Sequence, residues 1–192
     1  MQQARSKRDR ILDAAQVVFA RKGYYYSKIE EIAELADVGK GTVYEYFASK
    51  QELYKEMFKV ILSDYTRQME DLFSEDQTVE ERIRLLIEMH LKYMMENCRH
   101  TPQNFDDSSG LDEELLSWMF DLRRQNNERL GEIFARGVAR GELKAIDPEL
   151  GANMVAGLLK GLTVPMMVDG KSIDPRRVAA EVTDILFHGM AR

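Results

Sequence analysis

The chain has 192 residues and a net charge of −6, with 44% hydrophobic and 31% charged residues. These values are typical of a soluble globular protein and exclude a chain dominated by disorder. The single cysteine, Cys98, excludes an intrachain disulfide framework and a cysteine-based zinc site. The N-terminal residues MQQARSKRDR are charged rather than apolar. The sequence therefore predicts no secretory signal, and we expect a cytoplasmic protein.

Charge is distributed unevenly along the chain. Residues 1–50 hold nine Lys and Arg against seven Asp and Glu, whereas residues 51–192 hold 18 against 26. This asymmetry indicates an N-terminal part that faces nucleic acid and an acidic body with a different task. The most apolar stretch, 150–168, contains Lys160 and ends near Pro165 and Asp169, which predicts a buried helix rather than a membrane span.

Apolar residues recur at helical spacing along nearly the whole chain, and strand patterns are almost absent. The sequence predicts an all-α fold of about nine helices, over 6–22, 28–35, 39–46, 50–73, 79–97, 100–107, 112–139, 148–167 and 175–190. The first helix has an apolar face and ends at Gly23, and the second has an apolar face of its own. These faces consist of Ile11, Ala14, Ala15, Val18 and Phe19, and of Ile29, Ile32, Ala33 and Ala36.

Several helix starts carry capping signals. Capping boxes, in which a hydroxyl and a carboxylate satisfy unpaired backbone N–H groups, are predicted at Ser27 with Glu30, Ser49 with Glu52 and Thr78 with Glu81. Acid–proline pairs predict two later starts, at Asp147-Pro148 and Asp174-Pro175. Because no long linker is visible, we expect a small domain, residues 1–50, packed directly on a larger one, residues 51–192.

Residues 27–47 contain two short helices joined by a tight turn at 37–39, which is the pattern of a helix-turn-helix. Val43 and Phe47 lie four residues apart and are expected to anchor the second helix to the first. The residues that point elsewhere suit phosphate and base-edge contacts, and they are Lys40, Thr42, Tyr44 and Tyr46. Gly39 and Gly41 reduce helix stability and would let the backbone approach a duplex closely.

The stretch IEEIAELADVGKGTVYEYFASKQELY, residues 29–54, preceded by ILDAAQVVFARKGY, resembles the TetR family of transcriptional regulators. The resemblance implies an N-terminal three-helix DNA-binding domain and a larger helical domain for ligand binding and dimerisation. It places the four polar residues above in the recognition helix, with Lys50 holding phosphate at the next helix start and with Ser27 and Lys28 opening the motif. Asp37 departs from the family, which more often has glycine there.

The larger predicted domain, residues 51–192, also contains a sequence pattern that predicts dimerisation. In the helix predicted over 148–167, apolar residues surround the axis, and small residues would permit close helix approach. Together with the apolar residues of the last helix, they predict a homodimer through an isologous four-helix interface. The residues concerned are Met154, Val155, Leu158, Leu159, Leu162, Gly151, Ala152, Ala156, Gly157, Gly161, Val178, Val182, Ile185, Leu186 and Gly189. A plain monomer core is the alternative.

Ligand-binding candidates come from polar residues on apolar helix faces. His90 falls beside Tyr93 and Met94, and Asn126 interrupts the apolar seam of its helix. Either another helix or a ligand would satisfy them. With Trp118, Met154 and Leu158, these residues predict a pocket for a small apolar or amphipathic inducer. Phe105, Phe120, Phe134 and the methionines are further candidates for its lining, and plain core packing is the alternative for all of them.

The sequence thus predicts a ligand-responsive DNA-binding regulator: a repressor that an inducer releases from a pseudo-palindromic operator. The sign of control stays open. A helical protein-interaction scaffold is one alternative. An enzyme is another, which the sequence disfavours because His90, His100 and His188 form no metal-binding pair and no nucleophile or nucleotide motif is present. No cofactor, metal site or membrane partner is expected.

Overall fold

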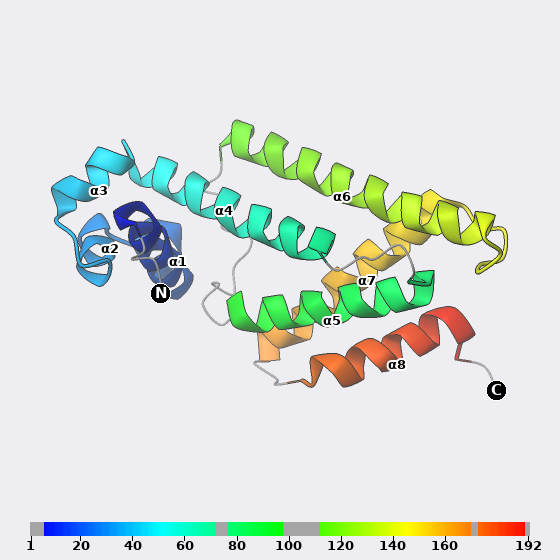
Figure 1. Cartoon of the computed structure of the whole chain (residues 1–192). Helices are drawn as coiled ribbons and strands as arrows, with labels where there is room; N and C mark the ends of the chain where they lie inside the picture. Colours follow the sequence, from blue (N-terminus) through cyan, green and yellow to red (C-terminus); the bar gives the residue numbers. More distant parts are fainter. Residues whose placement is uncertain (1–5, 72–76, 98–111, 170–172, 191–192) are drawn as a thin grey trace. The chain divides into compact units, whose positions relative to one another are not determined.

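The computed structural model describes residues 6–71, 77–97, 112–169 and 173–190, without the side chains of Asp71 and residues 164–169. All regular structure in these ranges is α-helical (Figure 1). The helices are α1 (Lys7–Tyr26), α2 (Ile29–Leu35), α3 (Lys40–Tyr46), α4 (Lys50–Asp71), α5 (Val79–Asn97), α6 (Glu113–Ala139), α7 (Pro148–Asp169) and α8 (Pro175–His188). They confirm eight of the nine predicted helices, and the ninth, over 100–107, lies outside the described residues.

Local capping chemistry sets several of these boundaries. In the capping box before α5, Glu81 N donates to Thr78 Oγ1 at 3.2 Å and Thr78 N donates to Glu81 Oε2 at 2.9 Å. Asp174 accepts from two backbone N–H groups at the start of α8. Gly23, at a φ of 72°, interrupts the regular geometry of α1, and so confirms the predicted break there.

The chain packs as two compact units. Among the described residues, unit 1 comprises 6–64, 97 and 112–117, and unit 2 comprises 65–71, 77–96, 118–169 and 173–190. Helices α4 and α6 therefore contribute to both units. The units reflect packing alone, and the predicted functional division at residue 50 stays a prediction.

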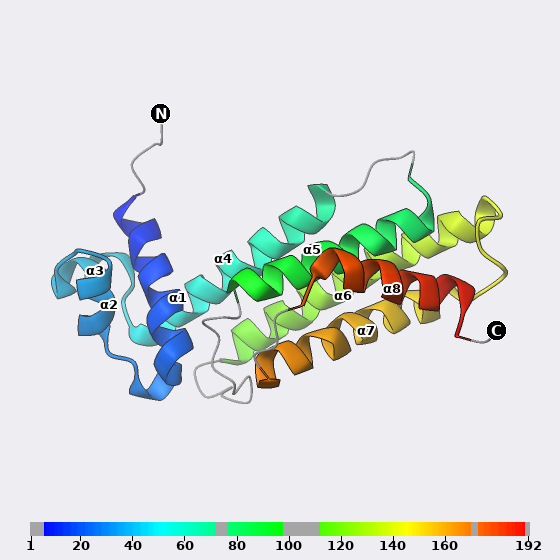
Figure 2. The ribbon, with the colours of Figure 1, turned by 90° about the horizontal axis from the view of Figure 1, so that it is seen from below.

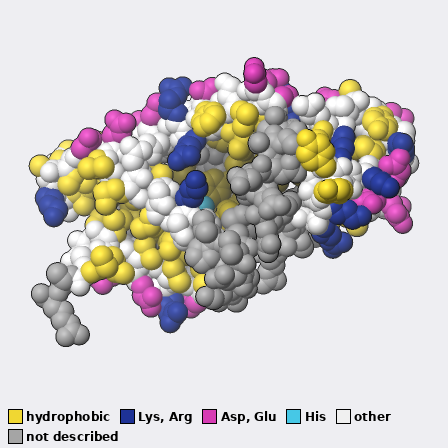
Figure 3. Space-filling view, turned by 180° about the vertical axis from the view of Figure 1, so that it is seen from behind, with side chains coloured by type: hydrophobic (Ala, Val, Ile, Leu, Met, Phe, Trp, Pro, Cys, Tyr) yellow, Lys and Arg dark blue, Asp and Glu magenta, His cyan; other side chains and the backbone are white. Residues whose placement is uncertain are grey.

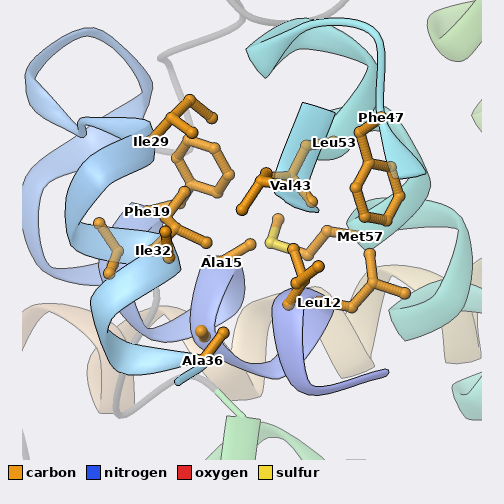
Figure 4. Close-up of a cluster of buried hydrophobic side chains, with 14 of the residues drawn as sticks. Leu12, Ala15, Phe19, Ile29, Ile32, Ala36, Val43, Phe47, Leu53 and Met57 are labelled. Atoms are coloured by element: carbon orange, nitrogen blue, oxygen red, sulfur yellow. The ribbon is translucent and has the colours of Figure 1, made fainter. Parts of the chain in front are cut away.

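The core of unit 1 joins α1, α2 and α3 to the start of α4 (Figure 4). Both predicted apolar faces are buried in it, and Val43 and Phe47 anchor α3 as predicted. The aromatic ring of Tyr54 packs on Phe19 and on Phe58, with ring centroids 4.8 Å apart in each pair. Because these contacts fix α3 from one side only, its other side is left at the surface.

Helix α5 provides much of the core of unit 2, since its residues Ile83, Leu86 and Ile87 are fully buried. Helix α8 lies alongside α5 in both ribbon views (Figure 1, Figure 2). Between α6 and α7, Asn127 donates from Nδ2 to Asn153 Oδ1 at 3.0 Å. Helix α7 is buried on the side of Val155, yet Met154 is exposed, so apolar residues do surround this helix as predicted.

Candidate functional site

The turn between α2 and α3 has the geometry of a helix-turn-helix. Ala36 N and Val38 N close the end of α2 by donating to Ile32 O and Ala33 O. Asp37 adopts a φ of 53°, in the left-handed region that favours glycine, so this chain keeps the backbone conformation although it lacks the glycine. The turn therefore survives the one departure from the family pattern.

Helix α3 presents the predicted polar face to solvent. The side chains of Tyr44 and Tyr46 are 46% and 44% exposed, and Lys40 is also exposed, whereas Thr42 is half-buried. Gly39 has an ordinary φ of −71°, and a Cβ added at Gly41 would meet nothing within 4 Å. Folding therefore gives no reason for glycine at these two positions.

Lys40 makes two contacts on the surface of unit 1. Its Nζ donates to Glu30 Oε1 of α2 at 2.6 Å and lies 5.9 Å from the centroid of the Tyr44 ring. The hydrogen bond with Glu30 raises the pKa of Lys40, and the same bond lowers the pKa of Glu30. The ion pair thus joins the first helix of the motif to the second.

Lys50 has a different environment. Its Nζ donates to the backbone carbonyl of Tyr25 at 3.2 Å and lies 4.6 Å from the centroid of the Tyr24 ring. Burial lowers its pKa. In this structure Lys50 therefore holds the end of α1. Tyr25 and Tyr26, beside Lys50, are strongly exposed. No role was predicted for either residue from the sequence, although three consecutive tyrosines at a helix end are visible in it.

The predicted capping box at Ser27 and Glu30 is wrong. Ser27 is only 3% exposed, and its hydroxyl donates to the carbonyls of Gly23 at 2.6 Å and Val18 at 3.2 Å. Helix α2 instead begins after the exposed Lys28, which makes no side-chain cap. The Ser27 side chain therefore closes α1 from inside the unit, and its predicted contact with DNA stays a prediction.

Unit 2 contains an interior polar cluster, which we define as Tyr65, His90 and Tyr93. Tyr65 Oη lies 2.8 Å from His90 Nδ1, and the Tyr65 and Tyr93 rings pack edge to face at 5.2 Å. Burial lowers the pKa of His90 to about 4, an effect that the Leu159 backbone carbonyl partly offsets, and burial also raises the pKa of Tyr65. The imidazole is therefore neutral near pH 7.

Asn126 is linked to this cluster through Thr66. Its Nδ2 donates to Thr66 Oγ1 at 3.5 Å, and Thr66 directly follows Tyr65 on α4. Asn126 Oδ1 is buried and has no hydrogen-bond partner among the described residues. The structure thus brings His90 and Tyr93 together and adds Tyr65, which sequence reasoning missed because it lies 25 residues from His90.

The remaining ligand candidates differ in exposure. Met154 is 54% exposed, and its predicted contact with a ligand stays a prediction. Met94, Trp118 and Leu158 are half-buried. Within the described ranges, no helix has the length and apolar character that a membrane span requires, and no three His, Cys, Asp or Glu side chains are grouped to hold a metal ion.

Both halves of the chain match known bacterial regulators. Residues 11–57 match the family described as bacterial regulatory proteins, tetR family, and residues 76–190 match the tetracyclin repressor-like C-terminal domain. The chain therefore belongs to the TetR family of bacterial regulatory proteins. It is a ligand-responsive, DNA-binding transcriptional regulator, and the resemblance predicted from residues 29–54 is confirmed.

Individual relatives agree over nearly the full length. The chain is 28% identical to the fatty acid metabolism regulator protein of Bacillus subtilis, covering 99% of this chain and 98% of that one. The structure of FadR from B. subtilis in complex with stearoyl-CoA is similar with a TM-score of 0.77 at 25% identity, covering 95% and 99% of the two chains. The structure of PfmR from Thermus thermophilus gives a TM-score of 0.76 at 26% identity, covering 98% and 100%.

Proposed function

We propose that this protein is a cytoplasmic repressor that binds a pseudo-palindromic operator as a homodimer and leaves it when a long-chain acyl ligand binds unit 2. The observation that carries the DNA-binding part is the exposed polar face of α3, held in place by the buried Val43 and Phe47. A dimer would set two such helices in successive major grooves, roughly 34–36 Å apart. We propose no catalytic activity, in keeping with relatives that are named as regulators.

The proposed DNA contacts divide by chemistry. Lys40 and Thr42 would read base edges, and Tyr44, Tyr46, Lys28 and Lys50 would contact phosphates. Gly39 and Gly41 support close approach, because neither is needed for folding and a side chain there would stand between α3 and the duplex. Tyr25 and Tyr26 join the set as exposed phosphate donors beside Lys50.

The proposed dimer forms through α7 and α8. Leu150 and Met154, with Gly157 and Gly161 further along, share one face of α7, where the two apolar side chains are 57% and 54% exposed. A Cβ added at either glycine would meet nothing within 4 Å. Figure 3 views the molecule from the side of α7 and shows hydrophobic side chains gathered on this face of unit 2. A second copy of the same helix would cover this apolar surface.

The proposed ligand is a fatty acyl thioester. The relative from B. subtilis was solved with stearoyl-CoA, and the interior cluster here offers hydrogen-bonding groups in apolar surroundings. We assign the polar part of the ligand to His90, Tyr65, Tyr93 and Asn126. The half-buried Met94, Trp118 and Leu158 are proposed to contact its chain.

The first test is selection of bound fragments from sheared genomic DNA by the purified protein, followed by sequencing. Enrichment of a shared inverted repeat supports the proposal, and diffuse recovery contradicts it. Tyr44→Ala is expected to weaken all selected sites similarly, whereas Thr42→Ala is expected to change their sequence preference. Lys144→Ala, an exposed lysine of unit 2, is the control and should bind like the wild type.

Two further measurements test the ligand and the dimer interface proposed for unit 2. Stearoyl-CoA added to the protein–operator complex is expected to release the DNA, and persistence of the complex with every acyl chain length would contradict the ligand assignment. Met154→Glu is expected to give monomers in sedimentation velocity, because it buries a charge at the proposed interface. Gln125→Glu on the exposed side of α6 carries the same added charge and should stay dimeric.

A further inference from the structure

Glu30 is the acidic partner of the recognition helix. Its Oε1 accepts from Lys40 Nζ at 2.6 Å, across the turn that separates α2 from α3, and both side chains are more than half exposed. Glu30 therefore lies on the surface that the proposed function assigns to DNA. A carboxylate on such a surface opposes phosphate, so its presence there needs an explanation.

We propose that Glu30 limits DNA affinity by holding Lys40 in an ion pair that must break before the lysine can reach DNA. This inference rests on the proposed function, in which α3 reads DNA. On any duplex, the contact that Lys40 gains is offset by loss of the Glu30 contact and by repulsion between Glu30 and the phosphate backbone. On the operator, a guanine edge accepts a hydrogen bond from Lys40 in place of the Glu30 carboxylate. Glu30 thus weakens binding to both kinds of duplex by similar factors.

Glu30 differs from the other two acidic residues of α2 in its ion-pair partner. Glu31 pairs at 2.7 Å with Lys22 of α1, so its charge is engaged away from the recognition helix. Glu34 is exposed and, among the described residues, makes no side-chain ion pair or hydrogen bond. Glu34→Gln therefore removes the same charge from the same helix without releasing a recognition-helix lysine, and it is the matched control for Glu30→Gln.

The experiment measures binding of the full-length protein to the selected operator and to a scrambled duplex of equal length, by fluorescence anisotropy over a salt series. Glu30→Gln is expected to tighten binding to the operator and to the scrambled duplex by about fivefold each. The slope of log K against log salt should steepen by about 2 for a dimer, since one cation is freed in each protomer. Glu34→Gln should change the affinity for the two duplexes by a smaller factor than Glu30→Gln does. Thermal melts establish that the variants fold.

A double variant separates the pair from general charge removal. In a Lys40→Gln background, Glu30→Gln should behave like Glu34→Gln, because no lysine remains to be freed. Equal effects of Glu30→Gln and Glu34→Gln in the parent, or an undiminished effect of Glu30→Gln in the Lys40→Gln background, overturn the inference while leaving DNA reading by α3 intact. A wild type that does not discriminate the two duplexes overturns the proposed function, and this inference with it.

Discussion

Protonation of His90 should destabilise the folded protein in mildly acidic solution. Burial lowers the pKa of His90 to about 4 from its ordinary 6.5, so the folded state binds a proton less readily than the unfolded chain does. Above pH 6.5 neither state is charged at this ring and folding bears no penalty. As the pH falls from 6.5 to 4, the unfolded state takes up the proton first, and stability is lost in that window.

The expected magnitude follows from the two pKa values. Their difference corresponds to a loss of about 3 kcal/mol by pH 4, of which about 1 kcal/mol falls between pH 7 and about pH 5.5, above the range where carboxylates titrate. The ring is mostly buried, and Tyr65 Oη at 2.8 Å holds its Nδ1, so little water reaches the charge. The loss of stability between pH 7 and about pH 5.5 is therefore the part that can be assigned to His90 most directly.

The assay is urea unfolding followed by circular dichroism at closely spaced pH values, for the wild type and for His90→Gln. Glutamine retains a hydrogen-bonding side chain toward Tyr65 but does not titrate, so His90→Gln should lose about 1 kcal/mol less than the wild type between pH 7 and about pH 5.5. Equal losses in the two proteins would refute the reasoning that a neutral, buried imidazole underlies the effect. An NMR titration of the His90 ring gives a direct check of its pKa.

Three further variants should lower the free energy of unfolding, each measured by urea denaturation. Ser27→Ala removes a buried hydroxyl that donates to two carbonyls and should cost about 1–2 kcal/mol, and an unchanged value would contradict its structural role. Asp174→Ala removes the N-cap of α8 and should cost about 1 kcal/mol, whereas a cost near zero would mean that the cap is replaced. Gly137→Ala places a methyl group against the Val79 side chain and should cost about 1–3 kcal/mol, while Gly41→Ala, with open space around it, should not destabilise.

Local sequence was sufficient to predict the helices and most of their ends, because these depend on neighbours within four residues. The box at Thr78 and Glu81 and the cap at Asp174 formed as the pattern predicted. The orientation of α3 was also readable, since Val43 and Phe47 lie on one side of a short helix and only that side can be buried.

Packing between helices, by contrast, selected the partner that each polar group took. Ser27 and Glu30 fit the local capping pattern, but Ser27 bonds to the distant Val18 carbonyl and Glu30 to Lys40, because the packing of α1, α2 and α3 brings those groups within reach. The pairing of Tyr65 with His90 is equally invisible in the sequence, since two residues 25 positions apart meet only when α4 packs on α5. Periodicity specifies which face of a helix is buried, and only packing specifies what that face meets.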